Sequence, residues 1–142
     1  MNALSFEVVG IPKPQGSMKA FAVGGVARMK PSGGNDFAAW RNAVSDAART
    51  AIGDRDPLDG PLHLSVAFRF PMPKSRGKSA HALGYIPKTT APDLDKLVRS
   101  IGDALTAANV ITDDARFASL TALKHEVTGW TGCVIGISEL TP

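Results

Sequence analysis

Cysteine is almost absent from the sequence: Cys133 stands alone, so no disulfide can form within the chain. No hydrophobic run reaches the roughly 18 residues of a membrane-spanning helix, and no apolar segment of signal-peptide length stands at the N-terminus. These absences argue against a disulfide-bonded secreted scaffold and against a membrane protein. We therefore expect a cytoplasmic protein in which Cys133 is a small buried residue.

Acidic residues are missing from residues 71–92, and residues 1–35 contain Glu7 as their one acid. The basic residues of these two stretches are Lys13, Lys19, Arg28, Lys30, Lys74, Arg76, Lys78 and Lys88. Acids gather instead in residues 93–142, although the net charge of the whole chain is only +3. Basic stretches beside an acidic region suit a protein that binds a phosphate backbone. Exposed loops that simply carry lysines are the alternative interpretation.

Apolar residues make up 44% of the 142 residues, which is enough for one packed domain over 1–142. The alternation and spacing of these residues predict a series of elements. They are a strand at 4–9, a hairpin at 21–27, a basic loop at 28–34, a helix at 36–52, a strand at 63–70, a long irregular segment at 71–92, a helix at 95–108, and strands at 116–127 and 133–140. This order predicts an α/β or α+β fold with a mixed β-sheet packed with two main helices.

The most informative stretch is Pro92-Asp93-Leu94-Asp95-Lys96-Leu97, where two aspartates lead into an amphipathic segment. Apolar residues in this segment recur at spacings of three and four, which predicts the helix at 95–108. Asn109 is expected in the left-handed conformation that ends such a helix. In an extended entry to the helix, residues i and i+2 point the same way. Asp93 and Asp95 are therefore expected to face one point outside the helix start.

A second acidic pair, Asp113-Asp114, follows this helix. Residues 109–114 span about 20 Å when extended and the helix about 21 Å, so the run reaches the helix start only if it goes straight back. Carboxylates gathered there would repel one another without a cation, and their oxygens suit Mg²⁺ or Mn²⁺. Such an ion could activate water against a phosphodiester, while Lys96 or Arg99 stabilises the developing charge. The alternative is that these aspartates only cap a helix and form a solvated turn.

Three motifs in this region resemble, in order and spacing, the core motif of the RusA-type Holliday-junction resolvases. They are Pro92-Asp93-Leu94-Asp95-Lys96-Leu97, then Asp103-Ala104-Leu105 in the same helix, and Asp113-Asp114-Ala115 after it. The resemblance implies the RusA fold, a homodimer, and a Mg²⁺-dependent endodeoxyribonuclease that resolves Holliday junctions and other branched DNA by paired symmetric nicks in recombination and repair. It also leads us to expect that Mn²⁺ substitutes for Mg²⁺, and that the protein acts in a bacterium or a phage-infected host cell.

Carried over residue by residue, the resemblance assigns metal binding to Asp93, Asp95 and Asp114. The lysine of the family's helix falls on Arg99, and Lys96 stands where the family has asparagine, so either cation is a candidate for the catalytic role. The expected DNA-binding residues are those of the two basic stretches, Lys13, Lys19, Arg28, Lys30, Lys74, Arg76, Lys78 and Lys88.

Two other classes of function fit parts of the sequence. A non-catalytic branched-DNA-binding module would use the same basic stretches, with the aspartates as caps and turns. A metal-dependent transferase could use Asp93-Leu94-Asp95 to hold a nucleotide-sugar diphosphate. The chain is short for such a transferase and shows no second nucleotide-binding element, so divalent-dependent cleavage is the property that separates the main alternatives.

Overall fold

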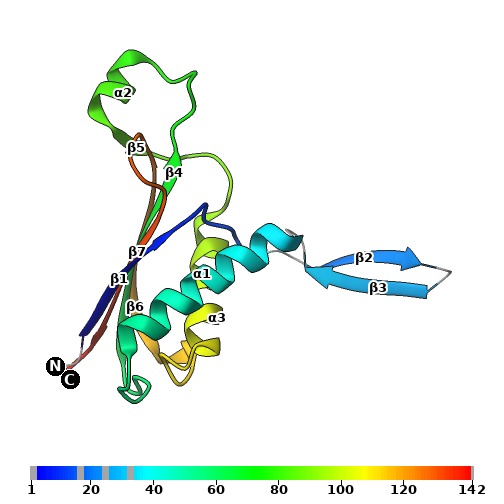
Figure 1. Ribbon diagram of the computed structural model, residues 1–142, viewed down its shortest axis with the longest axis vertical. Helices are drawn as coiled ribbons and strands as arrows, with labels where there is room; N and C mark the ends of the chain where they lie inside the picture. Colours follow the sequence, from blue (N-terminus) through cyan, green and yellow to red (C-terminus); the bar gives the residue numbers. More distant parts are fainter. Residues whose placement is uncertain (1–2, 16–17, 24–25, 32–33, 142) are drawn as a thin grey trace.

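A mixed sheet of five strands, in the order β1-β7-β4-β6-β5, forms the framework of the protein (Figure 1). The strands are β1 (Ala3–Val9), β7 (Gly132–Glu139), β4 (Leu62–Pro71), β6 (Phe117–Val127) and β5 (Tyr85–Pro87). The central strands β4 and β6 pair in parallel, and the other neighbours pair antiparallel. The predicted α+β class with a mixed sheet is therefore confirmed.

The structure is a computed structural model that describes residues 3–15, 18–23, 26–31 and 34–141. Over residues 18–35 its description covers the backbone alone. None of the helices in these ranges is long and apolar enough to cross a membrane.

Two long helices, α1 (Gly34–Ile52) and α3 (Leu94–Ala107), cover one face of the sheet (Figure 1). Alternation in β4 shows which face this is, because Leu64, Val66 and Phe68 are buried whereas Ser65 on the other face is exposed. The predicted apolar stripe of α3 lies in this core, and Trp40 of α1 joins it at 3% exposure. Cys133 is buried as expected, and burial raises the pKa of its thiol.

The predicted boundaries of α1 and α3 agree with the structure to within two residues. Asn109 has φ 58°, which confirms the left-handed end of α3. The predicted hairpin is longer than expected: β2 (Met18–Val23) pairs with β3 (Val26–Pro31) in a separate two-stranded sheet. Arg28 and Lys30 therefore belong to β3 rather than to a basic loop, because pairing continues as far as Met18 and Pro31. The turn residues Gly24 and Gly25 lie outside the described residues.

The prediction that residues 71–92 are irregular is wrong. This segment contains α2 (Lys78–Leu83) and β5, which we had not predicted. Gly84 ends α2 at φ 85°, a conformation that a side chain would disfavour, and its N–H donates to the carbonyl of Ala80. Tyr85 to Pro87 then pairs with β6, which joins this part of the segment to the edge of the sheet.

Candidate active site

The two aspartates at the start of α3 are not consumed by helix capping. Asp93 is the N-cap residue, with φ −67° and ψ 136°, and its carbonyl accepts the N–H of Leu97 at 3.1 Å. Its carboxylate, however, makes no capping hydrogen bond and is 64% exposed. Asp95 follows in the first turn and is also exposed. The interpretation of Asp93 as a simple side-chain cap therefore loses its main support.

Lys96 and Arg99, the two candidate catalytic cations, differ in their surroundings. Lys96 Nζ lies 3.7 Å from Asp93 Oδ2, and both side chains are about half exposed or more. Arg99 is exposed, lies one turn beyond Asp95, and has no hydrogen bond or ion pair within the described ranges. Arg99 is thus the cation that remains available to a phosphate.

The loop that follows β1 packs along the first half of α3. Gln15 donates its backbone N–H to the carbonyl of Lys96 at 2.9 Å, and Ser100 Oγ donates to the carbonyl of Lys13 at 3.0 Å. These contacts bring Lys13, a predicted DNA-binding residue, to the helix that carries the aspartates. On the β2–β3 hairpin, Lys19 and Lys30 are Cα partners of each other, and Arg28 is the partner of Phe21.

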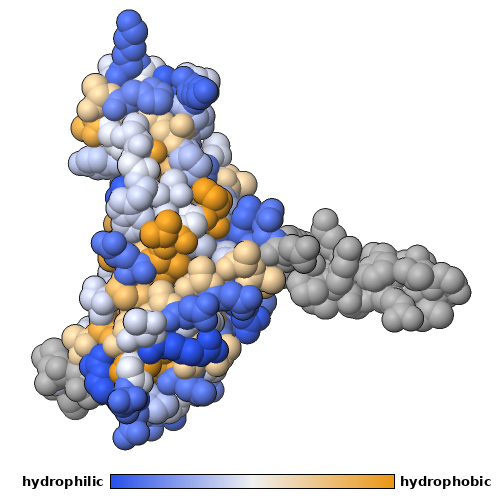
Figure 2. All heavy atoms as spheres, viewed as in Figure 1, coloured by the Kyte–Doolittle hydropathy of each residue, from blue (hydrophilic) through white to orange (hydrophobic). Residues whose placement is uncertain are grey.

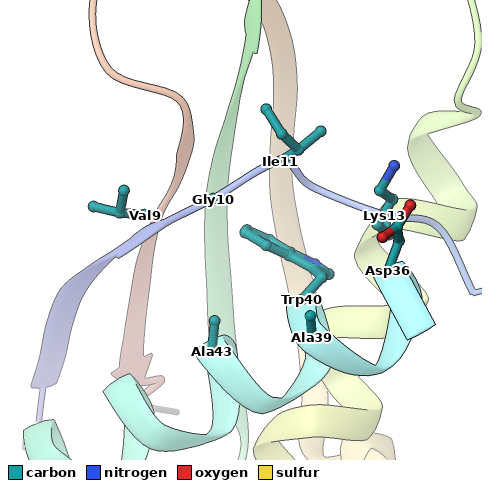
Figure 3. A pocket seen from close by; sticks show the side chains of 8 residues that line it. All are labelled: Val9, Gly10, Ile11, Lys13, Asp36, Ala39, Trp40 and Ala43. Carbon is teal, nitrogen blue, oxygen red and sulfur yellow. The ribbon is translucent and has the colours of Figure 1, made fainter.

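A hollow of about 380 Å³ lies between this loop and α1 (Figure 3). Trp40 lies beneath the backbone of Gly10 and Ile11, and Lys13 and Asp36 stand together at one end. A Cβ atom at Gly10 would lie 3.4 Å from the indole ring, so the absence of a side chain lets the loop pass close to Trp40. The ring supports the loop from below, and Trp40 belongs to the buried core.

The second acidic pair lies near Gly102 of α3 rather than at the start of that helix. Asp113 Oδ1 accepts the N–H of Ala115 at 2.9 Å and so caps a short 3₁₀ helix, η1 (Asp114–Arg116). Asp114 packs beside Gly102, where a Cβ atom would lie 3.4 Å from the Asp114 Cβ. Arg41 and Asp103 line the same hollow of about 310 Å³ as Asp114. Asp113 is thus the residue whose side chain caps η1.

The two carboxyl groups of this pair also differ in pKa. The N–H of Ala115 and a hydrogen bond with Asp114 lower the pKa of Asp113. The hydrogen bond with Asp113, burial, and the charges of Asp113 and Asp103 raise the pKa of Asp114. Asp114 therefore holds a proton more readily than an ordinary aspartate, and a cation beside it would oppose that effect.

Within one chain, the described residues bring Asp93 and Asp95 together at the helix start but do not bring Asp114 to them. They contain no group of three His, Cys, Asp or Glu side chains placed to hold one metal ion. Gly102, which Asp114 contacts, is about 12 Å along the helix from Leu94 at roughly 1.5 Å per residue. The run after Asn109 does not return straight along the helix, because Val110 and Thr112 form backbone hydrogen bonds with Leu58.

The donor chemistry at the helix start still suits Mg²⁺. This ion is commonly held by one or two carboxylates together with waters and the phosphates of a substrate. Asp93 and Asp95 supply two exposed carboxylates two residues apart, and Asp93 makes no capping hydrogen bond that a metal would have to break. The assignment of metal binding to Asp93, Asp95 and Asp114 remains a prediction.

Sequence reasoning missed Lys124. Its Nζ donates to the carbonyls of Thr90 at 2.7 Å and Pro92 at 2.6 Å, directly before Asp93. Lys124 is the Cα partner of Phe68, a buried residue on the helix-covered face of the sheet. A charged residue in the inward-facing series of a strand was the one signal that could have revealed it.

Sequence reasoning also missed Glu126, which is only 1% exposed. Arg76 donates to both of its carboxylate oxygens, from Nε at 2.7 Å and from Nη2 at 2.9 Å, and Lys88 Nζ lies 3.8 Å away. The hydrogen bond and charge of Arg76 lower the pKa of Glu126. Two predicted DNA-binding residues, Arg76 and Lys88, therefore tie the 71–92 segment to the sheet.

Lys74 and Lys78 lie on the same segment and are exposed, without a hydrogen bond or ion pair in the part of the chain that the structure describes. Figure 2 shows hydrophilic residues, among some apolar ones, at the end of the molecule that carries α2, and further hydrophilic residues toward the opposite end. Of the four basic residues predicted here, the structure leaves these two fully available to a phosphate backbone.

Comparisons with known proteins identify the family of the chain. Residues 10–137 match the model of the family described as "Endodeoxyribonuclease RusA". The chain is also 28% identical to YqaN, an uncharacterized protein of Bacillus subtilis (strain 168), over 130 residues that cover 87% of this chain and 88% of that protein. The family match includes the loop after β1, the whole of α3 and both acidic pairs.

Proposed function

The chain belongs to the RusA endodeoxyribonuclease family, and on that premise we propose that it is a Mg²⁺-dependent, structure-selective nuclease that resolves Holliday junctions by paired symmetric nicks. The family implies a Holliday-junction-resolving endonuclease. The observation that carries the metal-dependent mechanism is the start of α3, where Asp93 and Asp95 present exposed carboxylates and Asp93 makes no capping hydrogen bond.

The roles of this chain's residues follow from their positions. Asp93 and Asp95 would hold Mg²⁺, and Mn²⁺ in its place, through carboxylate oxygens. Bound Mg²⁺ supplies Lewis acidity and a water of lowered pKa. Arg99, exposed one turn beyond Asp95, would contact the scissile phosphate as charge develops on it. Lys96 Nζ lies 3.7 Å from Asp93 Oδ2 and would help to orient that carboxylate.

A homodimer would supply the third carboxylate that one chain does not bring to the helix start. Residues 117–123 of β6 form what we call the open edge: they pair with β4 on one side, while β5 pairs only with residues 125–127 on the other. Leu120 and Leu123 on this stretch are 52% and 40% exposed. Unpaired strand edges of this kind bind a further strand.

The ends of the open edge support such a dimer. Asp114 lies just before the start of β6, and Lys124, which holds the backbone next to Asp93, lies near its end. Two copies paired antiparallel along the edge would set the start of each β6 beside the end of the other. Asp114 of each copy would then approach Asp93 and Asp95 of its partner. A two-fold enzyme would also place one site on each of the two strands that a junction requires to be nicked.

DNA would lie across the basic residues around this site. Lys13 lies on the loop after β1, which contacts α3 at Ser100, and Lys74 and Lys78 belong to the α2 end of the molecule. Lys19, Arg28 and Lys30 belong to the β2–β3 hairpin. Arg76 and Lys88 bind Glu126, and they would hold in place the segment that carries Lys74 and Lys78. These residues carry no sequence preference of their own, so the protein would recognise the shape and charge of the junction.

Cleavage of a labelled synthetic four-way junction, with a matching linear duplex beside it, tests the proposal. We expect paired symmetric nicks in the junction alone, and only with Mg²⁺ or Mn²⁺. Asp95→Asn should lower the cleavage rate by about 10²-fold or more, because it removes a metal-binding carboxylate, and should leave junction binding without divalent ions intact.

Asp46→Asn is the matched control, because Asp46 is an exposed helix aspartate whose carboxylate pairs with Arg49 of its own helix and, in the described part of the chain, with no other residue. It should cut at the wild-type rate. An Asp95→Asn protein that cuts as fast as wild type would refute the metal site.

A non-catalytic branched-DNA-binding module is the second candidate. The observation in its favour is that the described residues of one chain contain no three-carboxylate group placed to hold a metal. Tight junction binding with no cleavage in Mg²⁺ or Mn²⁺ would favour it.

A further inference from the structure

Lys124 makes an unusual pair of contacts at the entrance to α3. Its ammonium group donates to two backbone carbonyls on either side of Ala91, those of Thr90 and Pro92, at 2.7 and 2.6 Å. These are the shortest hydrogen bonds that any lysine makes in the described part of the chain. A charged donor bound to two carbonyls fixes their positions more firmly than a neutral one would.

The position of Lys124 in the sheet explains why it reaches this segment. Its Cα partner on β4 is the buried residue Phe68, so the lysine side chain leaves the sheet on the face that α3 covers. A lysine on such a face loses solvation unless it finds acceptors, and the two carbonyls provide them. The backbone carbonyl of Lys124 accepts the N–H of Lys88 at 3.0 Å, so Lys124 also holds the chain two residues before Thr90.

The held segment leads directly into Asp93. Pro92 precedes it, and the Asp93 carbonyl accepts the N–H of Leu97 to begin the helix. Backbone on both sides of Asp93 is therefore fixed, by Lys124 before it and by α3 after it, whereas its carboxylate is exposed and makes no capping hydrogen bond. Such an arrangement sets the direction of the Cα–Cβ bond while it leaves the carboxylate oxygens available to a ligand.

We propose that Lys124 is a positioning residue that orients the Asp93 carboxylate for a divalent cation. The inference rests on the proposed function, because it assigns to Asp93 the role of metal ligand given above. Groups that orient metal ligands usually change metal affinity by 10–100-fold when they are removed. Lys124 itself touches neither the metal nor the DNA and acts only through the backbone of Thr90 to Pro92.

Mn²⁺ binding to the full chain, measured by electron paramagnetic resonance of the free ion, tests the proposal without reference to cleavage. Lys124→Met keeps the aliphatic stem and removes the donors, and it should weaken Mn²⁺ binding about tenfold. Lys124→Arg keeps a cationic donor and should recover part of the affinity. In an Asp93→Asn background, Lys124→Met should cause no further loss, because the lysine acts through Asp93.

The matched control is Arg69→Met. Arg69 Nε also donates to a backbone carbonyl, that of Trp130 at 2.9 Å, but on a turn distant in sequence from Asp93. This change should leave Mn²⁺ binding unaltered. In cleavage assays, Lys124→Met should raise the Mg²⁺ concentration for half-maximal rate about tenfold, with most of the rate recovered at saturating Mg²⁺.

The outcomes separate this proposal from the proposed function. If wild-type protein neither binds Mn²⁺ nor cleaves, the proposed function is wrong and the role of Lys124 falls with it. If wild type binds Mn²⁺ and Lys124→Met binds it equally well, or loses affinity equally in the Asp93→Asn background, Lys124 has no positioning role. Should Lys124→Met not fold, Lys124→Gln takes its place, because its shorter amide cannot reach both carbonyls.

Discussion

The two acidic pairs of this protein have similar composition and opposite surroundings. At the start of α3, neither aspartate serves as a side-chain cap, and both are exposed. At η1, Asp113 caps the 3₁₀ helix, and its proximity raises the pKa of Asp114. The two pairs thus differ in how the backbone binds their carboxylates, and our proposal takes Asp93, Asp95 and Asp114 as the metal ligands.

The two members of the second pair should differ most clearly when each is neutralised in turn. Asp114→Asn should lower junction cleavage by about 10²-fold or more, because it removes a proposed metal ligand. Asp113→Asn should retain most of the activity, since asparagine caps a helix about as well as aspartate does. Cleavage rates at saturating Mg²⁺ measure both effects. Equal losses in the two variants would contradict the division of roles.

Mixed dimers sharpen the same prediction. If Asp114 of one copy completes the site at Asp93 and Asp95 of its partner, a dimer of one Asp95→Asn chain and one Asp114→Asn chain has one intact site. Mixing the two inactive proteins should then restore single nicks in the junction. No activity after exchange of subunits, shown by differently tagged chains, would mean that the open edge of β6 does not join two copies in this way.

Two cations, Lys96 and Arg99, lie beside the first pair, and we expect their removal to affect cleavage in different ways. Arg99→Met should lower the cleavage rate about 10²-fold, because Arg99 is available to the developing charge. Lys96→Met should mainly change the Mg²⁺ concentration at which the rate is half-maximal, because Lys96 Nζ lies 3.7 Å from Asp93 Oδ2. Rates measured against Mg²⁺ concentration separate the two effects. A larger loss of maximal rate in Lys96→Met would reverse the assignment.

The pH dependence of cleavage should report the raised pKa of Asp114. Metal binding requires the ionised carboxylate, so the rate should rise with pH as Asp114 loses its proton, at a higher pH than an ordinary aspartate would. Asp113→Asn removes the neighbouring charge that contributes to this shift, so the acid limb should move to lower pH. A pH–rate profile at a fixed, subsaturating Mg²⁺ concentration tests this. An unmoved limb would show that another group controls it.

The smallest expected effect concerns the contact that places Asp114. Gly102→Ala adds a Cβ atom at ordinary contact distance, 3.4 Å from the Asp114 Cβ. The free energy of unfolding should rise by up to about 1 kcal/mol, because alanine favours a helix over glycine. Cleavage should stay within about twofold of wild type. Thermal unfolding and junction assays give both values, and a large loss of cleavage would mean that Asp114 is displaced.

Local regularities explain why much of the fold could be predicted. The spacing of Leu97, Ile101 and Leu105 predicted α3, and Asn109 marked its end. In β4, alternation predicted both the strand and its buried face. These signals depend on residues within one or two turns or a few strand positions, so no knowledge of distant partners is needed. The 71–92 segment lacked such periodicity, and its α2 and β5 were missed for that reason.

Asp93 and Asp95 could be placed at the start of a helix from sequence alone, because an extended residue before a first turn is a local property. The residues that surround them come from distant parts of the chain. Lys124 reaches Pro92 from 32 residues away, and Arg76 reaches Glu126 across 50. Asp114 lies beside Gly102 rather than at the helix start because residues 110–112 bond to Leu58. Such contacts depend on strand register and on the packing of α3 against the sheet, which no short stretch of sequence contains.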